Sequence, residues 1–178
     1  MSDDPTGVAL SVIEAARRST AELIGERWLH IGRACDLVWL GFGPYREVTD
    51  HRGGTREIGE YALHLQCPWR VTCGDRLVTR SSHIYVPGPD WTGDGDFDWD
   101  VRGANRFDVR AGELTAHLAG ERIVVTSVEV TERGDLTVAL SDGLRIEALR
   151  AGSVRDESWR FFRPHRDDDH VVVFEEED

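Results

Sequence analysis

The chain has 178 residues, with 40% hydrophobic and 30% charged residues, which suits a single globular domain able to bury a core. Its 33 acidic residues outnumber the 21 basic ones and give a formal net charge of −12, so we expect no nucleic-acid partner, because phosphate binding needs basic clusters. Every basic residue is arginine, which excludes a Schiff-base lysine and a lysine-bearing phosphate loop.

The first predicted element is a helix over residues 8–25. Its apolar side chains recur near helical spacing, and Gly25 is a natural stop for a helix. The apolar stripe consists of Val8, Val12, Ala15, Ala16, Leu23 and Ile24. We expect a single domain over residues 1–178, with flexible tails at residues 1–6 and 175–178.

Residues 27–81 form short runs with strand-like alternation of apolar and polar side chains. Turn-forming residues separate these runs at Gly43-Pro44, at residues 51–54 and at Gly74-Asp75. Because Gly74-Asp75 lies between two short runs, it predicts a hairpin. The expected strands cover residues 27–34, 36–42, 45–49, 58–67, 69–73 and 76–81.

A second helix is predicted over residues 105–119, after a loop rich in Pro, Gly and Asp at residues 86–103. Asn105 is a good N-cap, whereas Gly112 inside the segment weakens the helical pattern. The apolar residues that recur at helical spacing are Phe107, Ala111, Leu114 and Leu118.

The clearest pattern is a three-stranded meander over residues 121–150, with turns at Gly134-Asp135 and Asp142-Gly143. Residues 155–162 are interpreted as a short helical turn and residues 170–174 as a last strand. The predicted architecture is α+β: an N-terminal helix, a large mostly antiparallel sheet that is able to curl into a partial barrel, and one inserted helix.

Three segments carry a family resemblance: YALHLQCPWRV at residues 61–71, SDGLRIEA at residues 141–148 and ESWRFF at residues 157–162. With them the chain resembles a family of small uncharacterised actinobacterial proteins over roughly residues 28–174. That resemblance implies no reaction and no catalytic residues. In size, acidity and α+β layout the chain is also similar to immunity proteins of bacterial toxin systems.

The three cysteines, Cys35, Cys67 and Cys73, are an odd number and too few for a disulfide scaffold, so we expect reduced thiols. The acidic first five residues lack the pattern of a signal peptide, and no apolar run approaches the roughly 20 residues of a membrane span. These features together predict a cytoplasmic protein without a membrane partner.

The segment LHLQCPWRVTC, residues 63–73, combines a histidine, two cysteines and an arginine. In an extended strand His64 and Cys67 point to opposite faces, and Cys67 and Cys73 lie roughly 20 Å apart. We therefore expect a core strand here, and neither a zinc site nor a disulfide between these two cysteines.

The segment DWTGDGDFDWD, residues 90–100, is termed the acidic loop. It partly matches a calcium-binding loop but has Val101 where the bidentate glutamate belongs, so no metal and no cofactor are expected. Its alternating aspartates and aromatic residues favour a partner-binding surface, although inward-folded aromatics beside hydrated aspartates remain the alternative. The candidate partner-binding residues are Trp91, Asp94, Asp96, Asp98 and Trp99.

These features favour a non-enzymatic, cytoplasmic protein-binding module with an immunity-like or regulatory role and a basic protein as its partner. The alternative is a small-molecule-binding protein or a hydrolytic enzyme with a pocket in the mouth of a curled sheet. The candidate residues for that pocket are His64, Arg70, His83 and Tyr85. No pattern in the sequence sets the oligomeric state.

Overall fold

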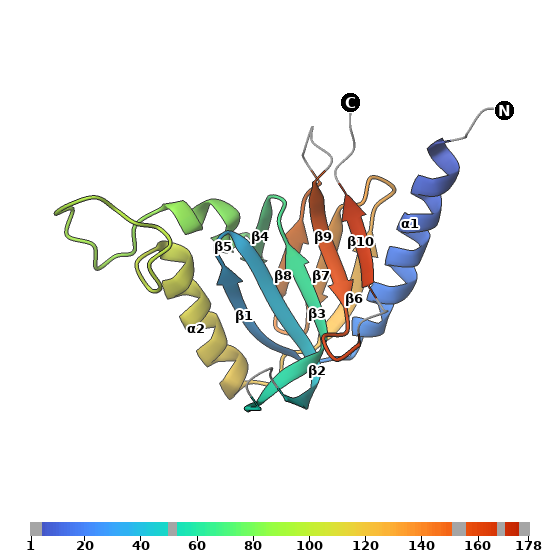
Figure 1. The fold of residues 1–178 in the computed structure, drawn as a ribbon, viewed down its shortest axis with the longest axis horizontal. Coiled ribbons are helices and arrows are strands. Elements are labelled where there is room, and N and C mark those ends of the chain that lie inside the picture. Colours follow the sequence, from blue (N-terminus) through green and yellow to red (C-terminus); the bar gives the residue numbers. More distant parts are fainter. Residues whose placement is uncertain (1–4, 50–52, 151–155, 167–169, 175–178) are drawn as a thin grey trace.

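The computed structural model describes residues 5–49, 53–150, 156–166 and 170–174, and shows an α+β fold with two five-stranded antiparallel sheets (Figure 1). The first sheet has the order β1-β2-β3-β9-β10 and consists of β1 (Trp28–Ala34), β2 (Leu37–Thr49), β3 (Thr55–Leu65), β9 (Glu157–Phe162) and β10 (His170–Phe174). The second sheet has the order β5-β4-β8-β7-β6 and consists of β4 (Trp69–Cys73), β5 (Arg76–Arg80), β6 (Val125–Val130), β7 (Leu136–Leu140) and β8 (Leu144–Ala148).

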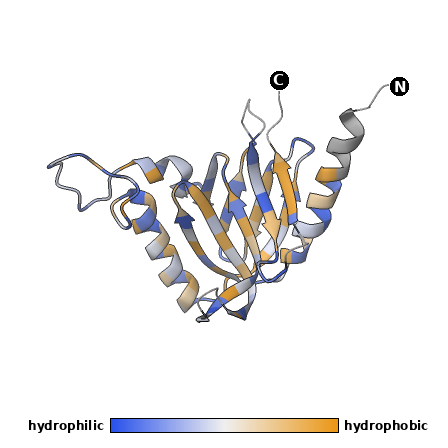
Figure 2. Cartoon of the chain, viewed as in Figure 1, coloured by the Kyte–Doolittle hydropathy of each residue, from blue (hydrophilic) through white to orange (hydrophobic). Residues whose placement is uncertain are grey.

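The hydrophobic core lies between the two sheets, because alternate side chains of both sheets join one buried cluster. Its largest members include Trp28, Phe42, Trp159 and Phe161 from the first sheet and Leu136 from the second. The strands carry many of the apolar residues, whereas the loop that projects beside α2 is mainly hydrophilic (Figure 2).

Two helices close the two open sides of this sandwich (Figure 1). Helix α1 (Pro5–Thr20) contacts the edge strands β10 and β6, and helix α2 (Arg106–Gly120) contacts the opposite edge strands β1 and β5. We call these the α1 side and the α2 side. The 3₁₀ turns η1 (Ala21–Leu23) and η2 (Ser81–Tyr85) follow α1 and β5. Neither α1 nor α2 is long and apolar enough to cross a membrane.

Both predicted helices are confirmed, with shifted boundaries. Helix α1 begins at Pro5, inside the expected tail, while residues 1–4 and 175–178 lie outside the described part of the chain. Within the predicted stripe Ala16 and Leu23 are buried, but Ile24 is 52% exposed because it lies beyond the helix, in extended backbone. Helix α2 buries the four predicted residues of its stripe and starts from the predicted N-cap.

The predicted meander and the hairpin at Gly74-Asp75 are confirmed by β6-β7-β8 and by the β4-β5 pair. Gly43-Pro44, in contrast, is not a break. Strand β2 continues through it with a β-bulge between Phe42 and Tyr45. Gly43 takes the positive φ of 87° that the bulge requires, and a bulge is a position where a strand tolerates proline.

Two further expectations are wrong. Glu157–Phe162 is strand β9 rather than a helical turn, because Trp159 and Phe161 alternate with outward side chains and fill the core. The strands also do not form one curled sheet. They divide into two sheets that are not closed into a barrel, and the edges are covered by helices instead.

The outer face of the first sheet carries two reciprocal pairs of glycine and aromatic residues. Gly32 pairs with Trp39 across β1 and β2, and Gly41 pairs with His30. A Cβ added to either glycine would overlap the ring opposite it, so each ring lies directly over a glycine. The His30 and Trp39 rings also meet edge to face, with centroids 5.0 Å apart.

Candidate functional site

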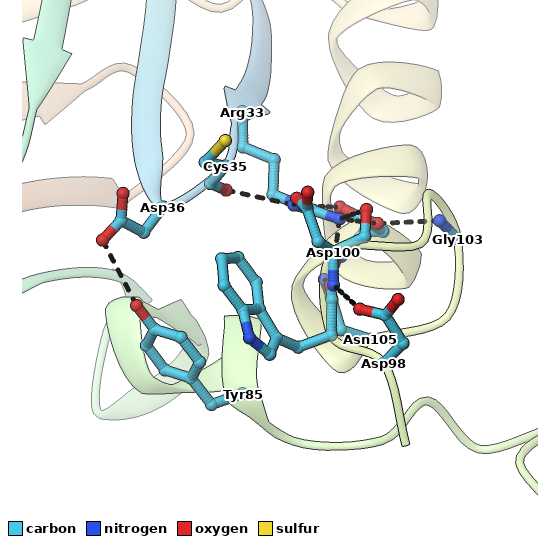
Figure 3. A network of polar contacts seen from close by, with 10 residues as sticks. Arg33, Cys35, Asp36, Tyr85, Asp98, Asp100, Gly103 and Asn105 are labelled. Carbon is cyan, nitrogen blue, oxygen red and sulfur yellow. Dashed lines mark hydrogen bonds and ion pairs between the residues drawn. The ribbon is translucent and has the colours of Figure 1, made fainter. Parts of the chain in front are cut away.

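The candidate site is built around Arg33, near the end of β1, where the acidic loop meets α2 (Figure 3). The guanidinium group forms a two-pronged contact with Asp108, with Nε 2.7 Å from Oδ1 and Nη2 3.0 Å from Oδ2. A second ion pair joins Nη1 to Oδ1 of Asp100 at 3.0 Å. The Arg33 side chain is only 8% exposed, so both carboxylates are held by a charge that is largely shielded from water.

Arg33 also fixes the backbone around it. Its Nη2 donates to the carbonyl oxygens of Trp99 and Asp100, both at 3.2 Å, and its Nη1 donates to the carbonyl of Cys35 at 3.0 Å. One side chain thereby ties together the β1–β2 turn, the end of the acidic loop and the first turn of α2.

We call these contacts of Arg33 with Asp100, Asp108 and the neighbouring backbone the Arg33 anchor. The start of α2 adds further hydrogen bonds to it. Asn105 accepts a hydrogen bond from the Asp108 amide at 2.8 Å and donates its own amide to the Trp99 carbonyl at 2.8 Å. The Gly103 amide donates to Asp108 Oδ2 at 2.7 Å. Burial alone would raise the pKa of Asp108, but the hydrogen bonds from Arg33 and Gly103 outweigh burial and hold that pKa below its usual value.

The aromatic residues of the acidic loop divide into two groups. Trp99 is half-buried, with its ring centroid 5.1 Å from that of Tyr85 and 6.0 Å from the Arg33 guanidinium carbon. Trp91 is 43% exposed, and its ring meets that of Phe97 in the same loop at a centroid distance of 5.9 Å. Trp99 is therefore part of the anchor, whereas Trp91 lies on the projecting part of the loop.

Asp94, Asp96 and Asp98, the three predicted partner-binding aspartates, are all exposed. Asp94 accepts a hydrogen bond from the Thr92 hydroxyl at 3.3 Å, and Asp98 accepts one from the Asp100 amide at 3.0 Å. These contacts shape the loop locally and leave the charges facing water. The loop itself projects from the body beside η2 and the start of α2 (Figure 1).

A cavity of about 490 Å³ lies between β1 and α2. The end of the acidic loop forms part of its wall through Asp100, and β1 contributes the consecutive residues 31–33. Phe107, Ala111 and Gly112 line it from α2. The volume is within the usual range of binding sites for small ligands.

A second cavity of about 310 Å³ lies on the other flank of α2, toward β4 and β5. It contains Cys73 together with His117 and Asp142, whose Nε2 and Oδ2 atoms are 2.9 Å apart. No hydrogen bond joins the Cys73 thiol to His117 within the described residues, so the three do not form an assembled nucleophile and base.

The four residues of the predicted enzymatic pocket are not brought together. The His64 ring contacts Phe162 on the first sheet, and Arg70 on the second sheet forms an ion pair with Glu147 at 2.6 Å. His83 is buried beside Thr79, whereas Tyr85 contacts Asp36 and Trp99 at the loop anchor.

Cys67 is buried, Cys73 is half-buried and Cys35 is exposed, and none of the three forms a disulfide bond in this structure. Cys35 occupies the β1–β2 turn with a φ of 52°, a left-handed conformation that is uncommon for a residue other than glycine. Across the described ranges, no group of three metal-ligating side chains is close enough to hold an ion.

Sequence reasoning did not identify the central role of Arg33 or of Asp108. The one available signal was the N-cap pattern at Asn105, which placed Asp108 in the first turn of α2. No local pattern marked Arg33, because its partners lie 67 and 75 residues away in the chain.

Comparison with known proteins gives no relative: no protein-family model matches the chain, and neither the curated proteins nor the solved structures include a significant match.

Proposed function

We propose that the protein is a non-enzymatic binding module whose acidic loop binds a basic protein partner. The observation that carries this proposal is the cluster of exposed carboxylates at Asp94, Asp96 and Asp98 beside the exposed ring of Trp91. Residues 90–100 include five aspartates and no basic residue, so the charge of the loop is not neutralised within it.

The physical argument combines attraction with apolar contact. Uncompensated carboxylates raise the rate at which a cationic surface is encountered, and an exposed aromatic ring supplies contact area once the surfaces meet. The Arg33 anchor supports the proposal, because a loop whose base is already fixed loses less conformational entropy when it binds a partner. A cytoplasmic, immunity-like or regulatory role belongs to the same proposal.

The experiment compares two triple variants with the same change in charge. Asp94, Asp96 and Asp98 are replaced by asparagine in one variant, and the exposed Glu121, Glu129 and Glu132 by glutamine in the other. The partner is captured from a cell lysate with the wild-type protein, and its association rate is then measured for each variant.

We expect the loop variant to associate about tenfold more slowly, with a weaker dependence on salt, because only it loses the steering charge. The glutamine variant retains the wild-type rate, and the melting temperature changes little in either. Equal association rates for the loop variant and the wild type would contradict the proposal.

The alternative of a small-molecule-binding protein has one observation in its favour, the cavity between β1 and α2. No observation favours an enzyme that uses His64, Arg70, His83 and Tyr85, because these residues are not brought together. A thermal-shift screen of metabolites against the wild type and Gly112→Leu, which fills the cavity, tests the alternative. A ligand that stabilises only the wild type would support it.

A further inference from the structure

The starting point is the outer edge of strand β1, which α2 covers but does not fully fill, because the cavity lies between them. Cys35 and Asp36 form a two-residue turn, so the flanking residues Ala34 and Leu37 make the first hydrogen-bonded pair of the β1–β2 ladder. Hydrogen-bonded pairs alternate along an antiparallel ladder. The backbone N–H and C=O groups of Ile31 and Arg33 therefore point away from β2.

Those backbone groups face the cavity. Ile31, Gly32 and Arg33 line it as consecutive residues, which places the strand edge itself, rather than one face of the strand, against the open space. Within the described part of the chain, the outward backbone groups of Ile31 and Arg33 make no hydrogen bond to a third segment. Two donors and two acceptors are thus available at this edge.

The opposite wall is a stripe of α2 that approaches the cavity with small side chains. Ala111, Gly112 and Thr115 line it, and a Cβ added at Gly112 would meet no atom within 4 Å. The helix is therefore recessed at Gly112, across the cavity from the outer edge of β1. Glycine lowers helix stability relative to alanine, so the recess is kept at a cost to α2.

We propose that the basic partner inserts an extended segment into this cavity, where the segment pairs with β1 as an additional strand of the first sheet. This inference rests on the proposed function and specifies how the same partner is held. At about 3.3 Å per residue, roughly three residues of the segment would face Ile31–Arg33 and satisfy its four free backbone groups.

Charge explains why the segment should be basic. Arg33 is already neutralised by Asp100 and Asp108, so Arg102 is the remaining cation in the cavity wall. The acidic loop continues from that wall through Asp100 into the exposed aspartates. Cationic side chains flanking the paired residues would meet these carboxylates, while a neutral or acidic strand would gain only the backbone bonds.

The experiment uses a fluorescein-labelled ten-residue peptide of alternating arginine and threonine, followed by fluorescence anisotropy. A second peptide has the same sequence with every backbone nitrogen methylated, so it keeps the charge and loses the donors. The protein is tested as the wild type, as Gly112→Leu, and as the matched control Gly120→Leu, whose position on α2 also has open space but does not line the cavity.

We expect the unmodified peptide to bind the wild type and Gly120→Leu, and methylation or Gly112→Leu each to weaken binding by about tenfold or more. Binding should also slow amide hydrogen exchange at Ile31 and Arg33 and leave Gly32, already paired with Trp39, unchanged. Failure of the unmodified peptide to bind, or equal affinities for both peptides, would overturn strand addition.

The two proposals fail in different ways. If the triple asparagine variant binds the peptide more weakly but Gly112→Leu binds it like the wild type, strand addition is overturned and the acidic loop keeps its role. If Gly112→Leu weakens binding and the triple asparagine variant does not, the proposed role of the loop is contradicted, and the strand addition that rests on it is overturned as well. Unchanged exchange at Ile31 and Arg33 in the presence of bound peptide also overturns strand addition.

Discussion

The α1 side and the α2 side close the same sandwich by different means. On the α1 side, Arg17 Nε donates to the Val130 carbonyl at 2.8 Å and Trp159 Nε1 donates to the Gly134 carbonyl at 2.7 Å. A Cβ at Gly134 would lie 3.0 Å from Val173 and 3.3 Å from Ile13, so this side is densely packed. Both cavities described above lie beside α2 instead.

The difference teaches that covering a sheet edge and filling the space beside it are separate tasks. Around Gly134 on the α1 side, packing does both. On the α2 side the ion pairs of Arg33 hold the helix and loop in place, while the space between helix and strand stays open. A binding site needs that second arrangement, in which the walls are fixed but not in full contact.

The largest expected effect comes from breaking the charge network on the α2 side. Arg33→Ala leaves the Asp108 carboxylate, 12% exposed, without its counter-charge, so the free energy of unfolding should fall by about 3–5 kcal/mol. Arg110→Ala is the control, because its ion pair with Glu113 is exposed and should contribute less than about 1 kcal/mol. Urea denaturation measures both, and similar losses would show that the α2 side does not depend on Arg33.

Valine substitutions at two glycines allow a direct comparison of the packing on the two sides. Gly134 and Gly143 have nearly the same φ, 89° and 84°, but a Cβ at Gly143 meets nothing within 4 Å. Gly143→Val should therefore lower the free energy of unfolding by about 1 kcal/mol or more, from backbone strain alone. Gly134→Val should lose about 1–3 kcal/mol more, because it also overpacks the α1 side. Thermal denaturation checks this order, and an unchanged melting temperature for Gly143→Val would contradict the turn assignment.

A stabilising change is expected at the recess of α2. Gly112→Ala adds a methyl group to open space and removes backbone freedom from the unfolded chain, so it should raise the free energy of unfolding by about 0.5–1 kcal/mol. The same substitution on a fully packed helix face would cost stability. A loss at this position, measured by urea denaturation, would mean that the recess is not open.

The smallest expected effect concerns pH and His83, in η2 on the α2 side. Burial, followed by the charges of Arg80, Arg106 and Arg110, lowers the pKa of His83 below 6.5. The unfolded chain therefore takes up a proton first, and the contribution of His83 to stability is full above pH 6.5 and decreases as the pH falls below it. The free energy of unfolding should therefore differ less between pH 7.5 and pH 5.5 in His83→Gln than in the wild type, as measured by urea denaturation at both pH values. An identical pH dependence in the two proteins would show that His83 does not contribute to it.

The sequence predicted those parts of the fold whose signals are local. The meander over residues 121–150 has its alternation and both turns within one stretch of chain, and α2 has its cap and apolar stripe within its own length. Strand β9 was not predicted because it is defined by its pairing with β3 and β10. The pairing with β3 joins residues more than ninety positions apart, such as Ala62 and Phe162. The division into two sheets has the same long-range origin.

The candidate site was predicted only in its exposed part. Composition alone indicated that the aspartates of the acidic loop would face water, and they do. The separate role of Trp99 could not be read from the loop, because it depends on Tyr85 and Arg33 from two other elements. The cavity could not be predicted from the sequence either, because it depends on how β1 and α2 are placed relative to each other and not on a pattern within either element.

The glycine–aromatic pairs on the outer face of the first sheet have an evolutionary consequence. A side chain at Gly32 would displace the Trp39 ring, and a side chain at Gly41 would displace His30. Neither glycine is free to change while the ring opposite it remains, whereas a smaller residue in place of the ring would release its glycine. The order of change is therefore constrained: in descendants of this chain, the ring should be replaced before its glycine or together with it, and the glycine should not change first.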